Sequence, residues 1–200
     1  MKDVISQPVA RMFEAFAELF DAEGRPGGDE AAAALRASRF GRRAHGGSST
    51  RLDAPIAMLT AGPGPEAVSA LRPMLPHLPW HYSGLEDGRI RPEISKYLAT
   101  CEVLGSRGIV DHPTVRVGLF FQGPNIDYVE RVHGAEETFV MLAGTGEWRR
   151  GAEAWRGAGV GDEIHHPSML PHQSRTGSEG FLALWRWTGD IRISTYELRG

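Results

Sequence analysis

The spacing of apolar residues changes near residue 106 of this 200-residue chain. Before that point apolar residues recur every three or four positions, which is the period of an amphipathic helix. The clearest case covers residues 8–23, where Gly24 follows as a stop signal and one face carries Val9, Met12, Phe13, Phe16, Leu19 and Phe20. The same period predicts further helices over residues 29–38, 65–71 and 92–104.

After residue 106 the period becomes two, which is the period of a β-strand with one buried face. Turn residues separate the apolar runs every eight to twelve positions, as in sandwiches and barrels. The predicted strands cover residues 114–121, 137–142, 146–150, 154–156, 162–166, 181–187 and 192–198.

These patterns predict an α+β fold that is mainly β, with a helical region over residues 1–105 packed on a β-barrel over residues 106–200. A barrel of this length is small for a core of its own. We therefore expect the helices to cover an open face of the barrel or to close its mouth.

Composition narrows the classes of function. A net charge of −3 without a long basic cluster argues against nucleic acid as the main partner. No apolar run reaches the length of a membrane span, and the N-terminus has no apolar leader. The single cysteine, Cys101, excludes an internal disulfide and fits a reducing compartment, so a cytoplasmic protein is expected.

Two short motifs carry the candidate chemistry. In the first, Glu137 follows His133 by four residues, and Gly144 comes seven residues later. In the second, Gly161 is followed by Pro167 after five intervening residues and by His172 after four more. These spacings resemble the two motifs of the cupin barrel, a double-stranded β-helix related to the jelly roll.

The motifs predict a metal site. Strand alternation sends His133 and Glu137 to the same face, because their separation is even, and His172 can approach from the facing strand. Two neutral imidazoles and one carboxylate bind a first-row divalent metal and leave positions open for a substrate. Iron, manganese, nickel, cobalt and zinc all suit this ligand set, and the sequence does not separate them.

One position departs from the usual cupin pattern. Typical cupins carry a histidine two residues before His133, and this chain has Arg131 there. A guanidinium stays protonated and cannot ligate a metal. Arg131 either directs its charge at the site and binds a substrate carboxylate, or points into water. His165 and His166 are adjacent, so one of them should face inward and the other outward.

The chain resembles the bacterial cupin-type dimethylsulfoniopropionate (DMSP) lyases. The likeness rests on the spacing of Tyr128, His133, Glu137 and His172 and on the segments 135–144 and 167–176. It implies a metal-dependent β-elimination, in which a base removes the proton next to the substrate carboxylate and dimethyl sulfide leaves. Acrylate is the second product.

The resemblance also assigns roles. It places His133, Glu137 and His172 at ligand positions, and Tyr128 at an active-site tyrosine position that makes it the candidate base. Phe139 stands where the lyases often carry a tyrosine that can serve as base, so it is expected to line the substrate site without exchanging a proton.

Aromatic walls for the sulfonium group are a further expectation of the resemblance. Trp80 and Tyr82 lie in a segment, residues 73–82, with three prolines in seven positions, which could form a lid over the barrel mouth. Trp148 is another candidate wall. Trp185 and Trp187 share one strand face and are expected to pack between the barrel and the helices.

Two other readings stay open. Phe139 and Arg131 change the groups available for acid–base catalysis but not the metal ligands. This favours another cupin reaction, such as dioxygenation or isomerisation of a small acid or sugar. A non-catalytic cupin that binds a small molecule as a sensor or store is the second. A homodimer is expected only by analogy with other cupins.

Overall fold

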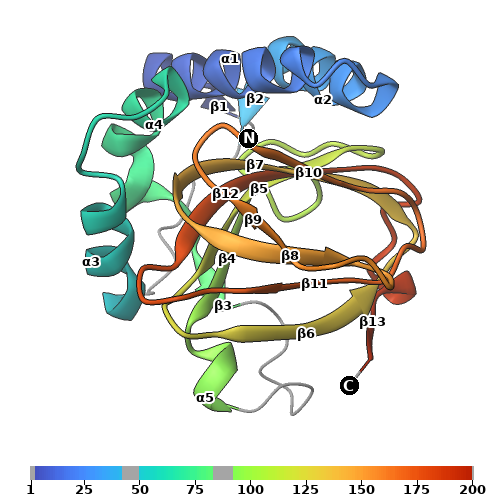
Figure 1. Cartoon of the computed structure of the whole chain (residues 1–200). Coiled ribbons are helices and arrows are strands. Elements are labelled where there is room, and N and C mark those ends of the chain that lie inside the picture. The colour runs from blue at the N-terminus through green and yellow to red at the C-terminus, as the bar shows by residue number, and fades with distance from the viewer. Residues whose placement is uncertain (1–2, 42–49, 83–91, 200) are drawn as a thin grey trace.

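The computed structural model describes residues 3–41, 50–82 and 92–199. Figure 1 shows a layer of helices wrapped around one side of a two-sheet β-barrel. The helices of this layer are α1 (Gln7–Ala22), α2 (Pro26–Ala37), α3 (Thr50–Leu59) and α4 (Glu66–Leu71). The 3₁₀ helix η1 (Arg72–His77), the short helix α5 (Pro92–Ser95) and a strand pair, β1 (Asp3–Val4) with β2 (Phe40–Gly41), complete this part of the fold.

Helix α1 follows directly from the apolar spacing. Pro8 lies in its first turn, where the missing N–H is tolerated, and Gly24 follows the helix with a positive φ of 65°. Its buried side chains are Val9, Met12, Phe13, Ala15, Phe16, Ala17 and Phe20. They form the side of the helix that packs on the barrel, as an amphipathic helix requires.

The barrel consists of two antiparallel sheets. The six-stranded sheet has the order β10-β7-β12-β5-β4-β3, and the five-stranded sheet has the order β13-β6-β11-β8-β9. The strands of the first are β3 (His81–Tyr82), β4 (Leu98–Leu104), β5 (Arg116–Gln122), β7 (Ala135–Gly144), β10 (Glu163–His166) and β12 (Phe181–Gly189). Those of the second are β6 (Asp127–Val132), β8 (Gly146–Arg150), β9 (Arg156–Ala158), β11 (His172–Arg175) and β13 (Glu197–Arg199).

Strand alternation divides the six-stranded sheet into two apolar faces. On β12, Leu182 and Leu184 belong to the cluster that includes the helices, whereas Trp185 and Trp187 belong to a second cluster inside the barrel. The interior cluster also holds Phe181 of β12 and aromatic residues from other strands, namely Phe120, Tyr128, Phe139 and Trp148. The barrel interior is therefore mainly aromatic, while the outer face packs against the helices.

A buried ion pair joins the two layers. The carboxylate of Glu23, directly after α1, accepts hydrogen bonds from Arg186 of β12 at 2.7 and 2.5 Å, and one from Thr138 of β7 at 2.6 Å. Both charged side chains are fully buried. Glu136 at 2.9 Å gives Arg186 a second carboxylate partner. This network fixes the end of α1 on the outer face of the sheet.

Three expectations about elements need correction. Residues 98–104 form strand β4 rather than the second half of a helix, because they pair with β5 and become a central strand buried on both faces. Helix α3 was not predicted, and residues 192–198 form a 3₁₀ turn, η2 (Ile193–Thr195), before β13 instead of one strand. Trp185 and Trp187 face the barrel interior and not the helices.

Strands β3 and β4 lie before residue 105 and pair within the six-stranded sheet. The barrel sheet thus begins earlier in the chain than the boundary expected from the change of period, and the division into two units stays a prediction. Among the described residues, no helix has both the length and the apolar character needed to cross a membrane.

Candidate metal centre

Three imidazoles surround one carboxylate oxygen inside the barrel. Oε2 of Glu137 lies 3.3 Å from Nε2 of His133, 3.4 Å from Nε2 of His172 and 3.4 Å from Nδ1 of His166. All four residues are buried. The structure therefore brings together His133, Glu137 and His172, as the motifs require, and adds His166.

Local backbone structure aims two of these imidazoles. His133 lies in the turn between β6 and β7, and its Nδ1 is 3.0 Å from the carbonyl of Ala135. His172 begins β11, and its Nδ1 is 2.9 Å from the carbonyl of Leu170. An imidazole that donates its Nδ1–H to a carbonyl presents the lone pair of Nε2. Both Nε2 lone pairs are thus directed at Glu137.

The carboxylate is held from its other side. Nε1 of Trp187, on the neighbouring strand β12, donates a hydrogen bond of 2.6 Å to Oε1 of Glu137. Trp187 and Glu137 are direct cross-strand partners, so their side chains leave the sheet on the same face. Oε1 is satisfied by the indole, and Oε2 remains for the histidines.

The charges of the cluster suit a cation. Burial lowers the pKa of His166 to about 4 and holds the pKa of His172 well below its ordinary value, so both rings are neutral at pH 7. Burial alone would raise the pKa of Glu137, but the electrostatic interaction with His133 and the contacts with all three imidazoles outweigh it and leave that pKa well below its usual range.

These donors fit a metal ion. Ligand atoms of His133, Glu137 and His172 lie within 4.8 Å of one another and could hold one. Lone pairs of two imidazoles directed at a carboxylate oxygen repel one another unless a cation or a proton lies between them. Two histidines and a carboxylate are donors that first-row divalent metals accept.

Arg131 also points into the barrel. Arg131 pairs with His172 and Tyr128 with Ser174, so β6 advances by three positions while β11 advances by two. This bulge turns both Tyr128 and Arg131 inward although their separation is odd. The Arg131 side chain is buried, and within the described part of the chain Nη1 and Nη2 have no hydrogen-bond partner. Its guanidinium carbon lies 4.1 Å from the centre of the Tyr128 ring.

A pair of tyrosines borders the cluster. The hydroxyl oxygens of Tyr128 and Tyr196 are 2.5 Å apart, and the Tyr196 ring stacks on the His133 ring with centroids 5.8 Å apart. Burial raises the pKa of Tyr128 above its ordinary value, although the charge of Arg131 acts in the opposite direction. Burial also raises the pKa of Tyr196 well above its ordinary value. The protein residues alone therefore keep both phenols protonated at pH 7.

Comparison with known proteins identifies the family. Residues 46–183, more than half of the chain, match the family described as dimethylsulfoniopropionate (DMSP) lyase. The chain belongs to the DMSP lyase family. The DMSP lyase DddQ of Ruegeria pomeroyi is 32% identical over 92 residues, which are 46% of this chain and 46% of that protein. The match thus spans about half the length of this curated relative.

Solved structures of the DMSP lyases share the fold. The crystal structure of DddQ from Ruegeria pomeroyi superposes with a TM-score of 0.63 at 24% identity, over 72% of this chain and 75% of that one. A structure reported for the DMSP lyases RdDddP and RnDddQII gives a TM-score of 0.74 at 21% identity, over 96% and 98%. The helical layer on a cupin barrel is therefore an arrangement known in this family.

The structure separates the aromatic residues expected in the site of this family member. Phe139 and Trp148 lie inside the barrel with ring centroids 4.7 Å apart, and both rings are within 6 Å of the His166 ring. Trp187 is 4.5 Å from His133. Trp80 instead packs in the cluster between the helices and the sheet, so the structure does not bring it to the histidines. The side chain of Tyr82 lies outside the described residues.

Sequence reasoning missed or underweighted three participants. His166 could not be separated from His165 by alternation until the register of β10 was known. Tyr196 lies in residues 192–198, which the spacing predicts as one strand. Two residues before it, Ser194 and Thr195, nevertheless favour turns. The polar role of Trp187 has no sequence signal, since it depends on the cross-strand position of Glu137.

A second cluster, of two glutamates and one histidine, already contains the positive charge of an arginine. Glu23, Glu136 and His165 offer ligand atoms within 4.8 Å of one another on the outer face of the sheet. Both carboxylates bind Arg186, and Thr138 lies 3.0 Å from Nδ1 of His165. Because the guanidinium supplies the positive charge, this cluster needs no cation.

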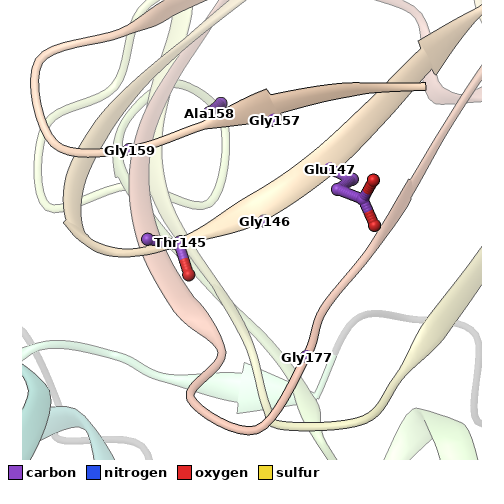
Figure 2. Close-up of a pocket in the computed structure, with 7 residues that line it drawn as sticks. All are labelled: Thr145, Gly146, Glu147, Gly157, Ala158, Gly159 and Gly177. Carbon is purple, nitrogen blue, oxygen red and sulfur yellow. The ribbon is translucent and has the colours of Figure 1, made fainter. Parts of the chain in front are cut away.

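Two cavities differ in their relation to the histidines. One has a volume of about 360 Å³. Its lining residues, drawn in Figure 2, are Thr145, Gly146, Glu147, Gly157, Ala158, Gly159 and Gly177. Glu137 lies near the start of β7, and this cavity lies beyond the other end, roughly 25 Å along the strand. The one charged side chain in its lining, Glu147, is paired with Arg175. A second, of about 180 Å³, lies where β8 and β9 face β10 and is lined in part by Trp148 and His165. Neither cavity is lined by His133, Glu137, His166 or His172, although Trp148, which lines the second, has its ring centroid 5.6 Å from that of His166.

Proposed function

We propose that this protein is a metal-dependent carbon–sulfur lyase that cleaves DMSP to dimethyl sulfide and acrylate by β-elimination. Membership of the DMSP lyase family supports the reaction class. The observation that carries the proposal is the buried guanidinium of Arg131, whose Nη1 and Nη2 have no partner among the described residues. A buried charge without a partner is unfavourable, so a site that retains one is suited to an anionic ligand.

Arg131 is proposed to bind the substrate carboxylate. DMSP, (CH3)2S⁺–CH2–CH2–COO⁻, carries one carboxylate at one end and a sulfonium cation at the other. A guanidinium offers two parallel N–H donors to a carboxylate, which fixes its position and orientation. Arg131 pairs directly with His172 across β6 and β11, so a carboxylate bound there lies beside the histidine cluster.

Aromatic rings are proposed to hold the sulfonium end. Phe139 and Trp148 contact each other inside the barrel, and Trp187 lies against His133. A cation over an aromatic face gains about 0.5–2 kcal/mol, and more so where water is excluded. The interior thus offers a cationic residue for one end of DMSP and aromatic faces for the other.

His133, Glu137 and His172 are the proposed ligands of the metal. When bound, a divalent cation supplies a Lewis acid that polarises the substrate carboxylate and acidifies the adjacent C–H bond. Zinc, iron, manganese, nickel and cobalt all accept two imidazoles and a carboxylate. Trp187, which donates to the far oxygen of Glu137, keeps the near oxygen directed at the two imidazoles.

Tyr128 is the proposed base. It removes a proton from the carbon next to the carboxylate, and that C–H electron pair becomes the C=C bond of acrylate. The C–S bond breaks with its electron pair on sulfur, which leaves as neutral dimethyl sulfide. Tyr196, hydrogen-bonded to Tyr128 at 2.5 Å, would stabilise the phenolate form.

The remaining expectations belong to the same proposal. The proposed partner is a small-molecule carboxylate. The protein is proposed to be cytoplasmic. Cys101 is a free, buried thiol, which fits a reducing compartment. A homodimer stays a prediction that the oligomeric state in solution would test.

Two observations favour a second candidate. Phe139 occupies an interior position near His166 and has no hydroxyl, and both described phenols at the cluster have raised pKa values. A cupin reaction that needs no strong base, such as dioxygenation of a small carboxylate, would use the same ligands and Arg131. A cupin that binds a small acid without converting it would also use them.

The test is detection of both products. Protein loaded separately with zinc, iron(II), manganese, nickel or cobalt is incubated with DMSP, and headspace dimethyl sulfide and dissolved acrylate are measured. Equal amounts of the two are expected with at least one metal. Absence of both with all five would refute the lyase proposal, and oxygen uptake by the iron(II) protein with small acids would then favour dioxygenation. A small acid that raises the melting temperature without being consumed would favour simple binding.

A further inference from the structure

His166 is buried at the candidate metal centre without a hydrogen-bond partner. Its side chain is fully buried, and neither ring nitrogen has a hydrogen-bond partner among the described residues. Buried polar atoms are nearly always satisfied, because an unpaired one costs about 1–3 kcal/mol. Two such atoms on one ring call for a binding partner.

The sheet register explains how His166 reaches the centre. His166 ends β10 and lies directly opposite Glu137 of β7. Directly opposed residues leave a sheet on the same face with Cβ atoms about 4.5–5.5 Å apart. His165, one residue earlier, faces Thr138 and Glu23 on the outer side. The backbone therefore directs His166, and not its neighbour, at the carboxylate.

The contacts of His166 resemble those of the other two imidazoles. Its Nδ1 lies 3.4 Å from Oε2 of Glu137, the same distance as Nε2 of His172. Its ring stacks on that of His172 with centroids 4.0 Å apart and an angle of 13° between the ring planes. Trp148 and Phe139 cover it with centroid distances of 5.6 and 5.9 Å. The nitrogen nearest the carboxylate is thus screened from water by aromatic rings.

We propose that His166 is a third imidazole ligand of the metal centre, and that it takes the place of the histidine that cupins usually carry where this chain has Arg131. The inference rests on the proposed metal site and names a ligand that neither motif supplies. It gives a set of three imidazoles and one carboxylate from His133, Glu137, His166 and His172. Arg131 is thereby free to bind the substrate.

The exchange accounts for two unusual features together. An arginine at a ligand position removes one donor and adds a buried positive charge. A neutral imidazole on β10 replaces the donor from the opposite sheet. One substitution without the other would leave either a centre short of one donor or an imidazole with two unpaired nitrogens.

Ligand counting by pulsed electron paramagnetic resonance tests the proposal. Copper(II) alone, without substrate, is bound to the wild-type protein, to His166→Asn and to the matched control His165→Asn, and the coupled remote imidazole nitrogens are counted. Three imidazoles are expected in the wild type and in His165→Asn, and two in His166→Asn. Two imidazoles in the wild type would overturn the proposal even if the His166 variant failed to fold, and so would three in a folded His166→Asn.

Zinc affinity gives a second readout. In competition with a chromophoric chelator, His166→Asn should bind zinc at least about 10–100-fold more weakly than His165→Asn, since loss of a mere hydrogen-bonding partner of a ligand already has an effect of that size. Equal affinities would contradict ligation. Lyase activity is assayed separately. Two imidazoles with dimethyl sulfide released would reject only the role of His166, whereas three imidazoles without product would reject only the lyase proposal.

Discussion

The guanidinium carbon of Arg131 lies 4.1 Å from the centre of the Tyr128 ring. The bulge in β6 creates this contact, because it turns two residues with an odd separation toward the same interior. The residue proposed to bind the carboxylate thus lies against the residue proposed to take the adjacent proton. Both belong to one strand, so a change in the bulge would displace binding and proton transfer together.

Arg131→Met should impair substrate binding. Hydrogen bonds to a charged partner contribute about 1.5–3 kcal/mol, so KM for DMSP should rise about 10–100-fold. Arg131→Lys keeps the charge but loses the paired donors, so its KM should lie between those of the wild type and Arg131→Met. The free energy of unfolding should hold or increase in Arg131→Met, because an unpaired buried charge is removed. Steady-state dimethyl sulfide release measures KM, and an unaltered KM in a folded Arg131→Met would contradict the assignment.

Tyr128→Phe should lower kcat by about 10²-fold or more if its phenol is the base, because general-base catalysis contributes about that much. The ring and its packing against Phe120 remain, so thermal stability should change little. Tyr97→Phe, at a residue 40% exposed, is the matched control and should behave as wild type. Turnover of Tyr128→Phe equal to wild type would remove Tyr128 as the base.

The pH profile tests the same role. Burial raises the pKa of Tyr128, so the phenolate fraction is small at pH 7 and grows as the pH rises. The wild-type rate should therefore increase toward alkaline pH. Tyr128→Phe should lose this increase, and a profile that falls with rising pH in the wild type would be the contrary result.

Phe139→Tyr should increase lyase activity. Phe139 lies on the same face of β7 as Glu137, two residues away, and its ring is 5.9 Å from that of His166. A hydroxyl there would return a phenol to the position where the lyases often carry one. Dimethyl sulfide release by this variant, with the metal content of both proteins matched, measures the effect. No gain in a folded, metal-loaded variant would make another substrate the better assignment.

His133→Ala and His172→Ala should each abolish stoichiometric metal binding. The barrel core is aromatic and aliphatic around the site, so far-ultraviolet circular dichroism should be close to wild type. Glu137→Gln should weaken binding less, since the amide keeps an oxygen ligand but loses the charge. His112→Ala, at a partly buried residue outside the cluster, is the control. Full metal content in both histidine variants, measured by elemental analysis after dialysis, would reject the site.

Local pattern predicted the elements whose environment is simple. Helix α1 was expected over residues 8–23 and covers Gln7–Ala22, and the strand expected at 146–150 is β8. Strand β4 was misread because burial on both faces removes the alternation that marks a strand, and Leu98 to Leu104 then fits a helix equally well.

The residues of the candidate site also divide into those that local spacing predicts and those that depend on strand pairing. Ligand spacing along one segment brought out His133, Glu137 and His172, which the structure places around one oxygen. His166 and Trp187 reach Glu137 through strand register, which depends on pairing between distant segments. Inward orientation of Arg131 depends on a bulge that has no local sequence signal.

Glu23→Gln should loosen the helical layer from the barrel. The Glu23 and Arg186 side chains are both fully buried, and breaking such a pair from one side typically costs about 3–5 kcal/mol because the other charge is left behind. Glu136 also binds Arg186, so a loss near the lower end, about 3 kcal/mol, is expected in urea denaturation. Glu14→Gln, which removes an exposed partner of Arg36, should have little effect.

The pH dependence of stability and a double variant complete this test. Burial would raise the pKa of Glu23, but Arg186 and Thr138 outweigh it, so the pKa in the folded protein lies below the ordinary value of 4.5. A carboxyl with a depressed folded-state pKa stabilises the fold above its unfolded pKa, and that stabilisation is lost as pH falls through the folded value. The wild type should thus lose stability below about pH 4.5 more steeply than Glu23→Gln.

Replacing both partners, as Glu23→Met with Arg186→Met, should recover much of the loss, because no buried charge remains unpaired. A double variant less stable than Glu23→Gln would show that the pair is worth more than the packing that replaces it.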